Sequence, residues 1–234
     1  MKRIGKLLLI VSIAITSLVS CELKQSGTTL DLESFNHETF TPEDLESWDF
    51  YGLGSVNSGS QFSLQENDST YGAMVVSPKS YKGDVVIRYK TMALTSATVL
   101  VVMHSMSDIG SGGALTIPEG YDGKMSLWTK EKDNYFFAFR NAAHNFPPFI
   151  RKYPEPGNDA LAVAQENVTL PGVHHSIEVG RIDNRLWLSI DGKKVVEAED
   201  ESMLPGGHIA IRVRGTAGLK AACLIKDLEI YSIN

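Results

Sequence analysis

Aromatic and cationic side chains gather in two neighbouring segments of the chain. The first runs from Tyr135 to Arg140 and the second from Phe149 to Tyr153, with His144 in the connection between them. Arginine presents a planar fork that binds a carboxylate through two hydrogen bonds, and histidine or tyrosine can transfer a proton. This set predicts a site for an anionic sugar such as a uronic acid. The predicted binding residues are Arg140, Arg151 and Lys152, and the candidate catalytic residues are His144 and Tyr153.

Two kinds of enzyme chemistry are compatible with these residues. A polysaccharide lyase needs one group to neutralise the uronate carboxylate, here Arg140 or Arg151, and a base for the proton at C5, here His144 or Tyr153. A glycoside hydrolase needs a pair of carboxylates, and the sequence offers only two exposed candidates for this pair. The alternative interpretation is that arginine and lysine at strand ends are simply solvated. The two carboxylate candidates are Glu178 and Asp108.

A second group of side chains is predicted to share one exposed sheet face. Its members are Trp187, Arg212 and Arg214, which have the opposite parity to a set of apolar residues. Aromatic rings stack on the C–H faces of sugars and arginine binds hydroxyls or carboxylates, so we predict that all three bind substrate. The alternative is that a loop covers Trp187 and that nearby acids pair with the arginines. The apolar set, which we predict to face the core, is Ile177, Val179, Leu186, Leu188, Ile190, Ile209, Ile211 and Val213.

β-Strands must position these residues, because alternation with a period of two dominates the chain after Trp48. Asp183-Asn184 and Asp191-Gly192 are hairpin turn signals that join three strands into a meander. The strands are predicted at Gln61–Leu64, Ala73–Val76, Asp84–Thr91, Thr98–His104, Met125–Trp128, Tyr135–Arg140, Phe149–Lys152, His175–Ile182, Arg185–Ile190, Lys193–Ala198, His208–Val213 and Ala221–Ile233.

Many short strands at this spacing predict an all-β fold, a two-sheet jelly-roll β-sandwich. A short N-terminal helix is predicted at Thr41-Pro42-Glu43-Asp44, which has a cap residue, a proline at the first helical position and early acids. Two long connections, Ser107–Gly123 and Asn141–Pro148, interrupt the strands. Long loops in a compact sandwich often carry function.

The first 20 residues have the pattern of a secretory signal peptide. Basic residues at positions 2, 3 and 6 precede an apolar run from Leu7 to Val19, shorter than the roughly 20 residues that span a bilayer. The run ends in Leu18-Val19-Ser20-Cys21, which resembles the lipobox of bacterial lipoproteins. The resemblance implies lipidation of Cys21 and anchoring to the membrane by acyl chains such as palmitate. An ordinary cleavable signal is the alternative. The expected division is signal peptide 1–20, lipidated tether 21–38 and β-sandwich domain 39–234.

Composition and charge limit the remaining possibilities. The formal charge of −6 becomes −9 when the three basic signal residues are removed, which argues against a nucleic-acid partner. Cys223 lies in an apolar run and is predicted to be a buried core residue. No spacing of histidine or cysteine indicates a metal centre, and we predict no cofactor. A structural calcium is compatible with a jelly roll, although no loop has a recognisable ligand spacing.

The domain resembles the concanavalin A-like lectin/glucanase superfamily. It is similar to an uncharacterised bacterial family found with pectin and rhamnogalacturonan utilisation and, more distantly, to the 3-keto-disaccharide hydrolase family. The sequence departs from the uncharacterised family at His144 and Pro147-Pro148. The resemblance covers most of residues 45–231 and is carried by Leu45-Glu46-Ser47-Trp48, Tyr135 to Arg140, Ile150-Arg151-Lys152, Gly207 to Arg212 and Ile225 to Tyr231.

The leading expectation is a lipid-anchored protein of the bacterial cell envelope that binds or processes an acidic oligosaccharide during polysaccharide utilisation. The expected partners are a poly- or oligosaccharide and the membrane, the latter through the N-terminal lipid. One alternative is a glycan-active enzyme, either a lyase or a hydrolase. The other is a non-catalytic structural lipoprotein that binds a protein. A deep, polar groove over Trp187 and Arg212 would disfavour this last alternative, whereas a flat apolar patch would support it.

Overall fold

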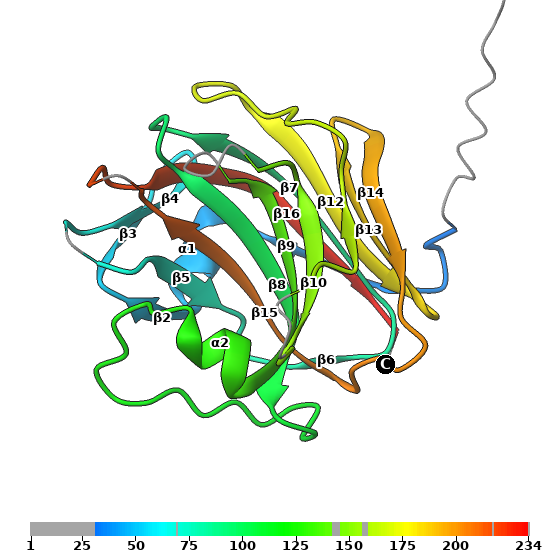
Figure 1. The fold of residues 1–234 in the computed structure, drawn as a ribbon. Coiled ribbons are helices and arrows are strands. Elements are labelled where there is room, and N and C mark those ends of the chain that lie inside the picture. Colours follow the sequence, from blue (N-terminus) through cyan, green and yellow to red (C-terminus); the bar gives the residue numbers. More distant parts are fainter. Residues whose placement is uncertain (1–30, 69, 142–145, 156–158, 217, 234) are drawn as a thin grey trace, which may run out of the picture. The chain divides into compact units, whose positions relative to one another are not determined.

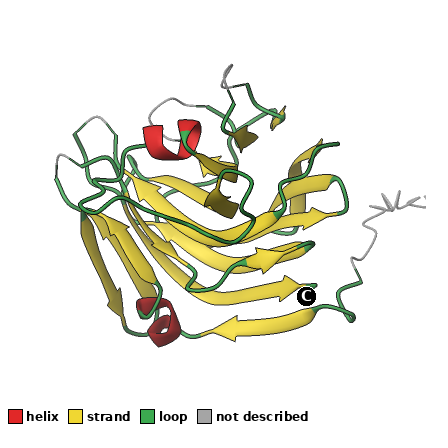
Figure 2. Ribbon diagram, turned by 90° about the horizontal axis from the view of Figure 1, so that it is seen from below, coloured by secondary structure: helices red, strands yellow, loops and turns green. Residues whose placement is uncertain are grey.

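Strands account for most of the chain in the computed structural model, which describes residues 31–68, 70–141, 146–155, 159–216 and 218–233. The predicted signal peptide, Cys21 and His144 lie outside the described residues. A compact unit spans Leu32–Asn234. Its strands form two antiparallel sheets that pack as a sandwich (Figures 1 and 2). The predicted all-β, two-sheet class is confirmed.

The first sheet has the strand order β14-β13-β12-β7-β16-β4-β3, and β1 also pairs with β16. β1 begins within the segment expected to be tether, because residues 36–38 already pair with β16. The strands of this sheet are β1 (Asn36–Phe40), β3 (Gly54–Ser58), β4 (Phe62–Glu66), β7 (Val85–Ala93), β12 (His175–Ile182), β13 (Arg185–Ile190), β14 (Lys193–Glu199) and β16 (Ala222–Ser232).

The second sheet has the order β11-β10-β9-β8-β15-β5-β2, and β6 also pairs with β15. β8, β9, β10 and β15 run side by side in Figure 1 and form its centre. The strands are β2 (Asp49–Gly52), β5 (Ala73–Val76), β6 (Tyr81–Lys82), β8 (Val99–Asp108), β9 (Lys132–Arg140), β10 (Phe149–Tyr153), β11 (Ala162–Val163) and β15 (Gly206–Arg214).

The predicted meander β12-β13-β14 is confirmed, and its turns explain why. Asp183, Asp191 and Gly192 adopt positive φ angles of 53°, 51° and 77°, the backbone that tight hairpins of this hand require. All eight apolar residues predicted to face the core are buried between the sheets. Cys223 is also there, fully buried as predicted.

Two short helices complete the described part of the fold (red in Figure 2). α1 (Pro42–Glu46) confirms the predicted helix, and Thr41 and Asp44 form the capping box at its start. Trp48, just beyond it, meets Phe40 of β1 edge-on at 5.5 Å. α2 (Ser126–Lys130) corrects the strand predicted at Met125–Trp128.

α2 forms because its two apolar residues pack against the outer face of the second sheet. Leu127 and Trp128 are adjacent, so on a strand they would point to opposite faces, whereas one helical turn buries both. They join a second apolar cluster, on this outer face, with residues such as Met103 and Phe136. The helix therefore covers part of the sheet, and the uncovered part carries the site described next.

Candidate functional site

A cavity of about 830 Å³ opens on the outer face of the second sheet. This volume lies within the 300–1,000 Å³ range of ordinary ligand pockets. Its floor consists of alternate residues of β8, β9, β10 and β15, those that point away from the core between the sheets. Three loops and α2 supply its walls. The floor residues are Val99, Phe136, Ala138, Phe149, Arg151, Tyr153, Arg212 and Arg214, and the walls include Glu66, Asp68, Tyr71, Thr129, Thr216 and Lys220.

Arg151 and Tyr153 form one polar group of the pocket. Both belong to β10 and lie two residues apart, so their side chains share a face. Arg151 Nη1 donates to the Tyr153 hydroxyl at 3.2 Å, and its guanidinium lies 4.6 Å from the ring centre of Phe149. Tyr153 also meets Phe136 edge-on, with ring centres 5.9 Å apart. The pair therefore combines a cation, a hydroxyl and aromatic surface.

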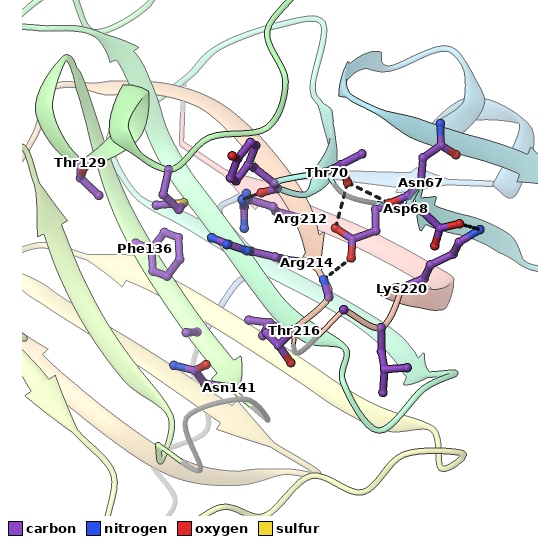
Figure 3. Close-up of a pocket in the computed structure, with 18 of the residues that line it drawn as sticks. Asn67, Asp68, Thr70, Thr129, Phe136, Asn141, Arg212, Arg214, Thr216 and Lys220 are labelled. Atoms are coloured by element: carbon purple, nitrogen blue, oxygen red, sulfur yellow. Dashed lines mark hydrogen bonds and ion pairs between the residues drawn. The ribbon is translucent and has the colours of Figure 1, made fainter.

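Arg214 and Tyr71 form a second group, at the end of β15. The Arg214 guanidinium lies 5.9 Å from the centre of the Tyr71 ring and extends toward Phe136 in Figure 3. Among the described residues, no carboxylate forms an ion pair with Arg214. Tyr71 is 42% exposed, so part of its side chain is accessible to a ligand. Together they offer an aromatic surface next to a cation that forms no ion pair within the described part of the chain.

The acidic residues of the pocket are already engaged. Glu66 is 3% exposed and accepts hydrogen bonds from the main-chain amides of Gly215 and Ala221. Asp68 forms an ion pair with Lys220 at 3.2 Å, drawn as a dashed line in Figure 3. Among the described residues, four cationic and two anionic side chains line the cavity, an excess of two positive charges in an acidic protein.

Arg212 lines the floor but is 1% exposed. Its Nη2 atom donates to the main-chain oxygens of Tyr71 and Gly123, the latter at 2.9 Å. Burial lowers the pKa of this guanidinium to about 10, which still leaves it charged at neutral pH. The Nη2 donors of Arg212 therefore bind the protein itself, whereas the guanidinium of Arg214 extends into the cavity.

Of the residues predicted to bind or react, the structure brings together Arg151, Tyr153, Arg212 and Arg214. Arg140 has another environment: it is 8% exposed, and its guanidinium donates to the main-chain oxygens of Ser96 and Thr169. Lys152 has the opposite parity to its neighbours on β10, and it forms an ion pair with Asp200 at 2.8 Å. Neither residue lines the pocket.

The prediction of one exposed face shared by Trp187 and the two arginines is wrong. Trp187 belongs to β13 in the first sheet and Arg212 to β15 in the second, so their outer faces point in opposite directions. Trp187 is only 6% exposed, because it packs on Gly180 of the neighbouring strand and donates to Glu178 at 2.7 Å. Trp187 is therefore covered, as the alternative held, but by the neighbouring strand β12 and not by a loop.

The two carboxylates considered for a hydrolase do not form a pair. Glu178 lies in the first sheet and is bound by Arg88, whereas Asp108 lies in the second and is bound by Lys132. Sequence reasoning missed Glu66, Asp68 and Tyr71 of the pocket wall. The available signal was weak: a lone aromatic residue in a polar turn between two strands.

Comparison of the structure with solved proteins identifies the architecture. A Bacillus subtilis protein of unknown function described as galectin-like superposes with a TM-score of 0.71 at 13% identity, over 84% of this chain and 98% of that one. The chain has a galectin-like fold. Neither a protein-family model nor a curated protein sequence matches it.

Two further neighbours share this architecture, one solved with a bound sugar and the other a glucanase. The VIP36 exoplasmic/lumenal domain, solved with Ca²⁺ and Man3GlcNAc bound, has a TM-score of 0.58 at 12% identity, over 83% of this chain and 87% of that one. The Bacillus licheniformis β-glucanase has a TM-score of 0.53 at 11% identity, over 86% and 94%. At such identities the likeness establishes the fold.

The described ranges also bear on metal and membrane binding. No three histidine, cysteine, aspartate or glutamate side chains there gather as a metal ion would need. The predicted possibility of a structural calcium stays a prediction. No helix in the same ranges is long and apolar enough to cross a membrane.

Proposed function

We propose that the galectin-like domain binds an acidic oligosaccharide in the pocket on the outer face of its second sheet. The observation that carries the proposal is the charge of this pocket: an excess of two positive charges, with Arg214 facing the cavity and bound to no carboxylate of the described residues. Arginine favours planar anions such as carboxylates and sulfates, and the exposed ring of Tyr71 suits the C–H face of a pyranose. Neighbours that bind or cleave glycans support the same assignment.

We further propose that the protein is anchored in the bacterial cell envelope through lipid on Cys21 and acts in polysaccharide utilisation. The lipobox-like segment and the apolar run before it support this anchor. The expected result is membrane association of the wild-type chain expressed in a bacterium and release of Cys21→Ser into the soluble fraction. A fatty-acid label on the wild-type chain that survives in Cys21→Ser would contradict the assignment.

The ligand proposal is tested with the chain from residue 22 on an array of pectic, alginate and sulfated oligosaccharides, together with neutral ones. We expect binding to acidic members, and a loss of about tenfold or more in affinity for Arg214→Met, since losing one desolvated charged contact costs about 1.5–3 kcal/mol. Arg185→Met is the matched control, because Arg185 is an exposed arginine of the first sheet. Absence of binding to every acidic sugar, or equal effects of the two variants, would refute the proposal.

A lyase is the second candidate function, favoured by the contact between Arg151 and Tyr153. In this reaction Arg151 would neutralise the uronate carboxylate and the Tyr153 oxygen would take the C5 proton. The C4–O4 bond then breaks, a C4=C5 double bond forms and the leaving oxygen gains a proton. Release of unsaturated product, seen by its ultraviolet absorbance, would establish the activity. We expect Tyr153→Phe to lose turnover while keeping affinity; an unchanged rate would remove this assignment.

A further inference from the structure

The buried guanidinium of Arg212 lies where two loops of the pocket meet. One loop joins β4 to β5 and carries Tyr71, and the other joins β8 to α2 and carries Gly123. The Nη2 atom donates to a main-chain oxygen of each, at Tyr71 and Gly123. A cation that hydrogen-bonds to two carbonyl oxygens in a water-excluded position holds both segments at a fixed separation.

Glycines make this close approach feasible. A Cβ atom on Gly72 would lie 2.7 Å from Nη2 of Arg212, and one on Gly123 would lie 2.2 Å from the main-chain oxygen of Gly72. Both distances are shorter than side chains tolerate, so the loops can stack over the guanidinium only with glycine at these positions. Main-chain contact reinforces the junction, because the Tyr71 amide donates to the Asp122 oxygen at 3.4 Å.

The junction determines where the Tyr71 ring lies. Tyr71 has its main-chain oxygen bound to Arg212 and its ring beside the pocket, where two cations flank it. Arg214 is 5.9 Å and Lys124 Nζ 4.9 Å from the ring centre. Lys124 follows Gly123 directly, so the same clamp sets the position of one of these cations as well.

We infer that Arg212 is a positioning residue of the pocket, which clamps the loops of Tyr71 and Gly123 so that the Tyr71 ring is presented to a sugar beside Arg214. This inference rests on the proposed function for its ligand. It gives Arg212 a role different from that of Arg214, which has the same type and face but projects into the cavity. Lysine cannot replace it fully, because its ammonium ends one bond short of the position of Nη2, the single atom that makes both contacts.

The first test needs no ligand. Amide hydrogen exchange is measured on wild-type chain from residue 22, Arg212→Lys and the control Arg185→Lys. We expect exchange at Tyr71 and Lys124 to rise by about tenfold or more in Arg212→Lys, while the amides of β12 and β13 stay as in wild type. Arg212→Gln, which removes the charge and both Nη2 contacts, is a second variant should the lysine variant fail to fold. Unchanged exchange at both loops in a folded variant would overturn the inference.

The second test asks whether Arg212 acts through Tyr71. Affinity for trigalacturonate is compared in wild type, Arg212→Lys, Tyr71→Ala and the double variant. We expect Arg212→Lys to lose about tenfold in affinity in the wild-type background and less than about twofold on Tyr71→Ala, the coupling that a shared mechanism produces. Equal losses in both backgrounds would overturn the inference. If trigalacturonate does not bind wild type, that failure counts against the proposed ligand class, and the exchange result alone decides the role of Arg212.

Discussion

Replacing His104 with phenylalanine is expected to weaken the pH dependence of folding. His104 lies in β8, 2% exposed, with its ring against Phe137 and Tyr135 of β9 at 5.1 and 5.2 Å. Arg181 reaches across from β12 in the other sheet and donates to the neighbouring Ser105 hydroxyl at 2.9 Å. Burial, and then the nearby charge of Arg181, hold the pKa of His104 well below its ordinary value of 6.5.

The direction and the size of this effect on the unfolding free energy follow from the proton that His104 binds on unfolding. The unfolded chain binds a proton at this histidine near pH 6.5, whereas the folded chain keeps it neutral. Its contribution to stability is therefore complete above that pH and is lost as the pH falls. Between about pH 7.5 and about pH 5 the loss amounts to at most about 2 kcal/mol of unfolding free energy, since one proton changes stability by about 1.4 kcal/mol per pH unit.

Urea unfolding at the two pH values measures this difference. We expect the wild-type chain to lose up to about 2 kcal/mol more than His104→Phe on acidification, because other titrating groups contribute equally to both. Phe137→Leu is the control: it disturbs the same ring stack without a titrating group, so it should weaken folding by a similar amount at both pH values. Equal pH dependence in wild type and His104→Phe would refute the reasoning.

Three further predictions concern residues outside the pocket. Gly180→Ala should destabilise the fold by about 1–3 kcal/mol, because overpacking forces the Trp187 ring away; its Cβ would lie 2.0 Å from that ring, whereas Gly59→Ala meets no such obstacle. Urea unfolding followed by tryptophan emission measures both. Arg140→Met should cost about 2–3 kcal/mol of stability, through its two lost carbonyl contacts, and leave sugar affinity within about twofold by calorimetry. Cys223, whose pKa burial raises to about 12, should react with a thiol reagent only after unfolding.

The strands were predictable where alternation and turn chemistry agree. β5, β12 and β13 have the bounds that the sequence predicts, because the last two are limited by turns with obligatory positive φ. The short strands β2 and β3 were not predicted. Their polar, glycine-containing sequences lack a strong alternation, and their formation depends on pairing with β5 and β4. Tertiary contacts likewise decide that α2 is a helix, because the four residues of the predicted strand Met125–Trp128 are too few to distinguish a strand from a helical turn.

Parity predicted which side chains leave the core, but it could not assign them to a sheet. Trp187 and Arg212 both point outward, as predicted, and still belong to opposite surfaces, because β13 and β15 lie in different sheets. The pairing of β15 with β8 and β5 is a long-range contact that no local pattern encodes. Parity within one strand was more informative: it correctly placed Arg151 with Tyr153, and Arg212 with Arg214, on the same side.

The two outer faces differ in whether their charged side chains are paired, and this difference is the reason to assign the ligand to the second sheet. On the first sheet Arg88 pairs with Glu178 at 2.8 Å and Lys90 with Asp227 at 3.0 Å, and these residues line a smaller cavity of about 350 Å³. Cations and acids there are neighbours across strands, so they neutralise one another. A ligand with a carboxylate would have to break an existing ion pair to bind at that surface. On the second sheet Arg214 requires no such exchange, so an incoming anion gains a charged hydrogen bond without displacing an acid of the described chain.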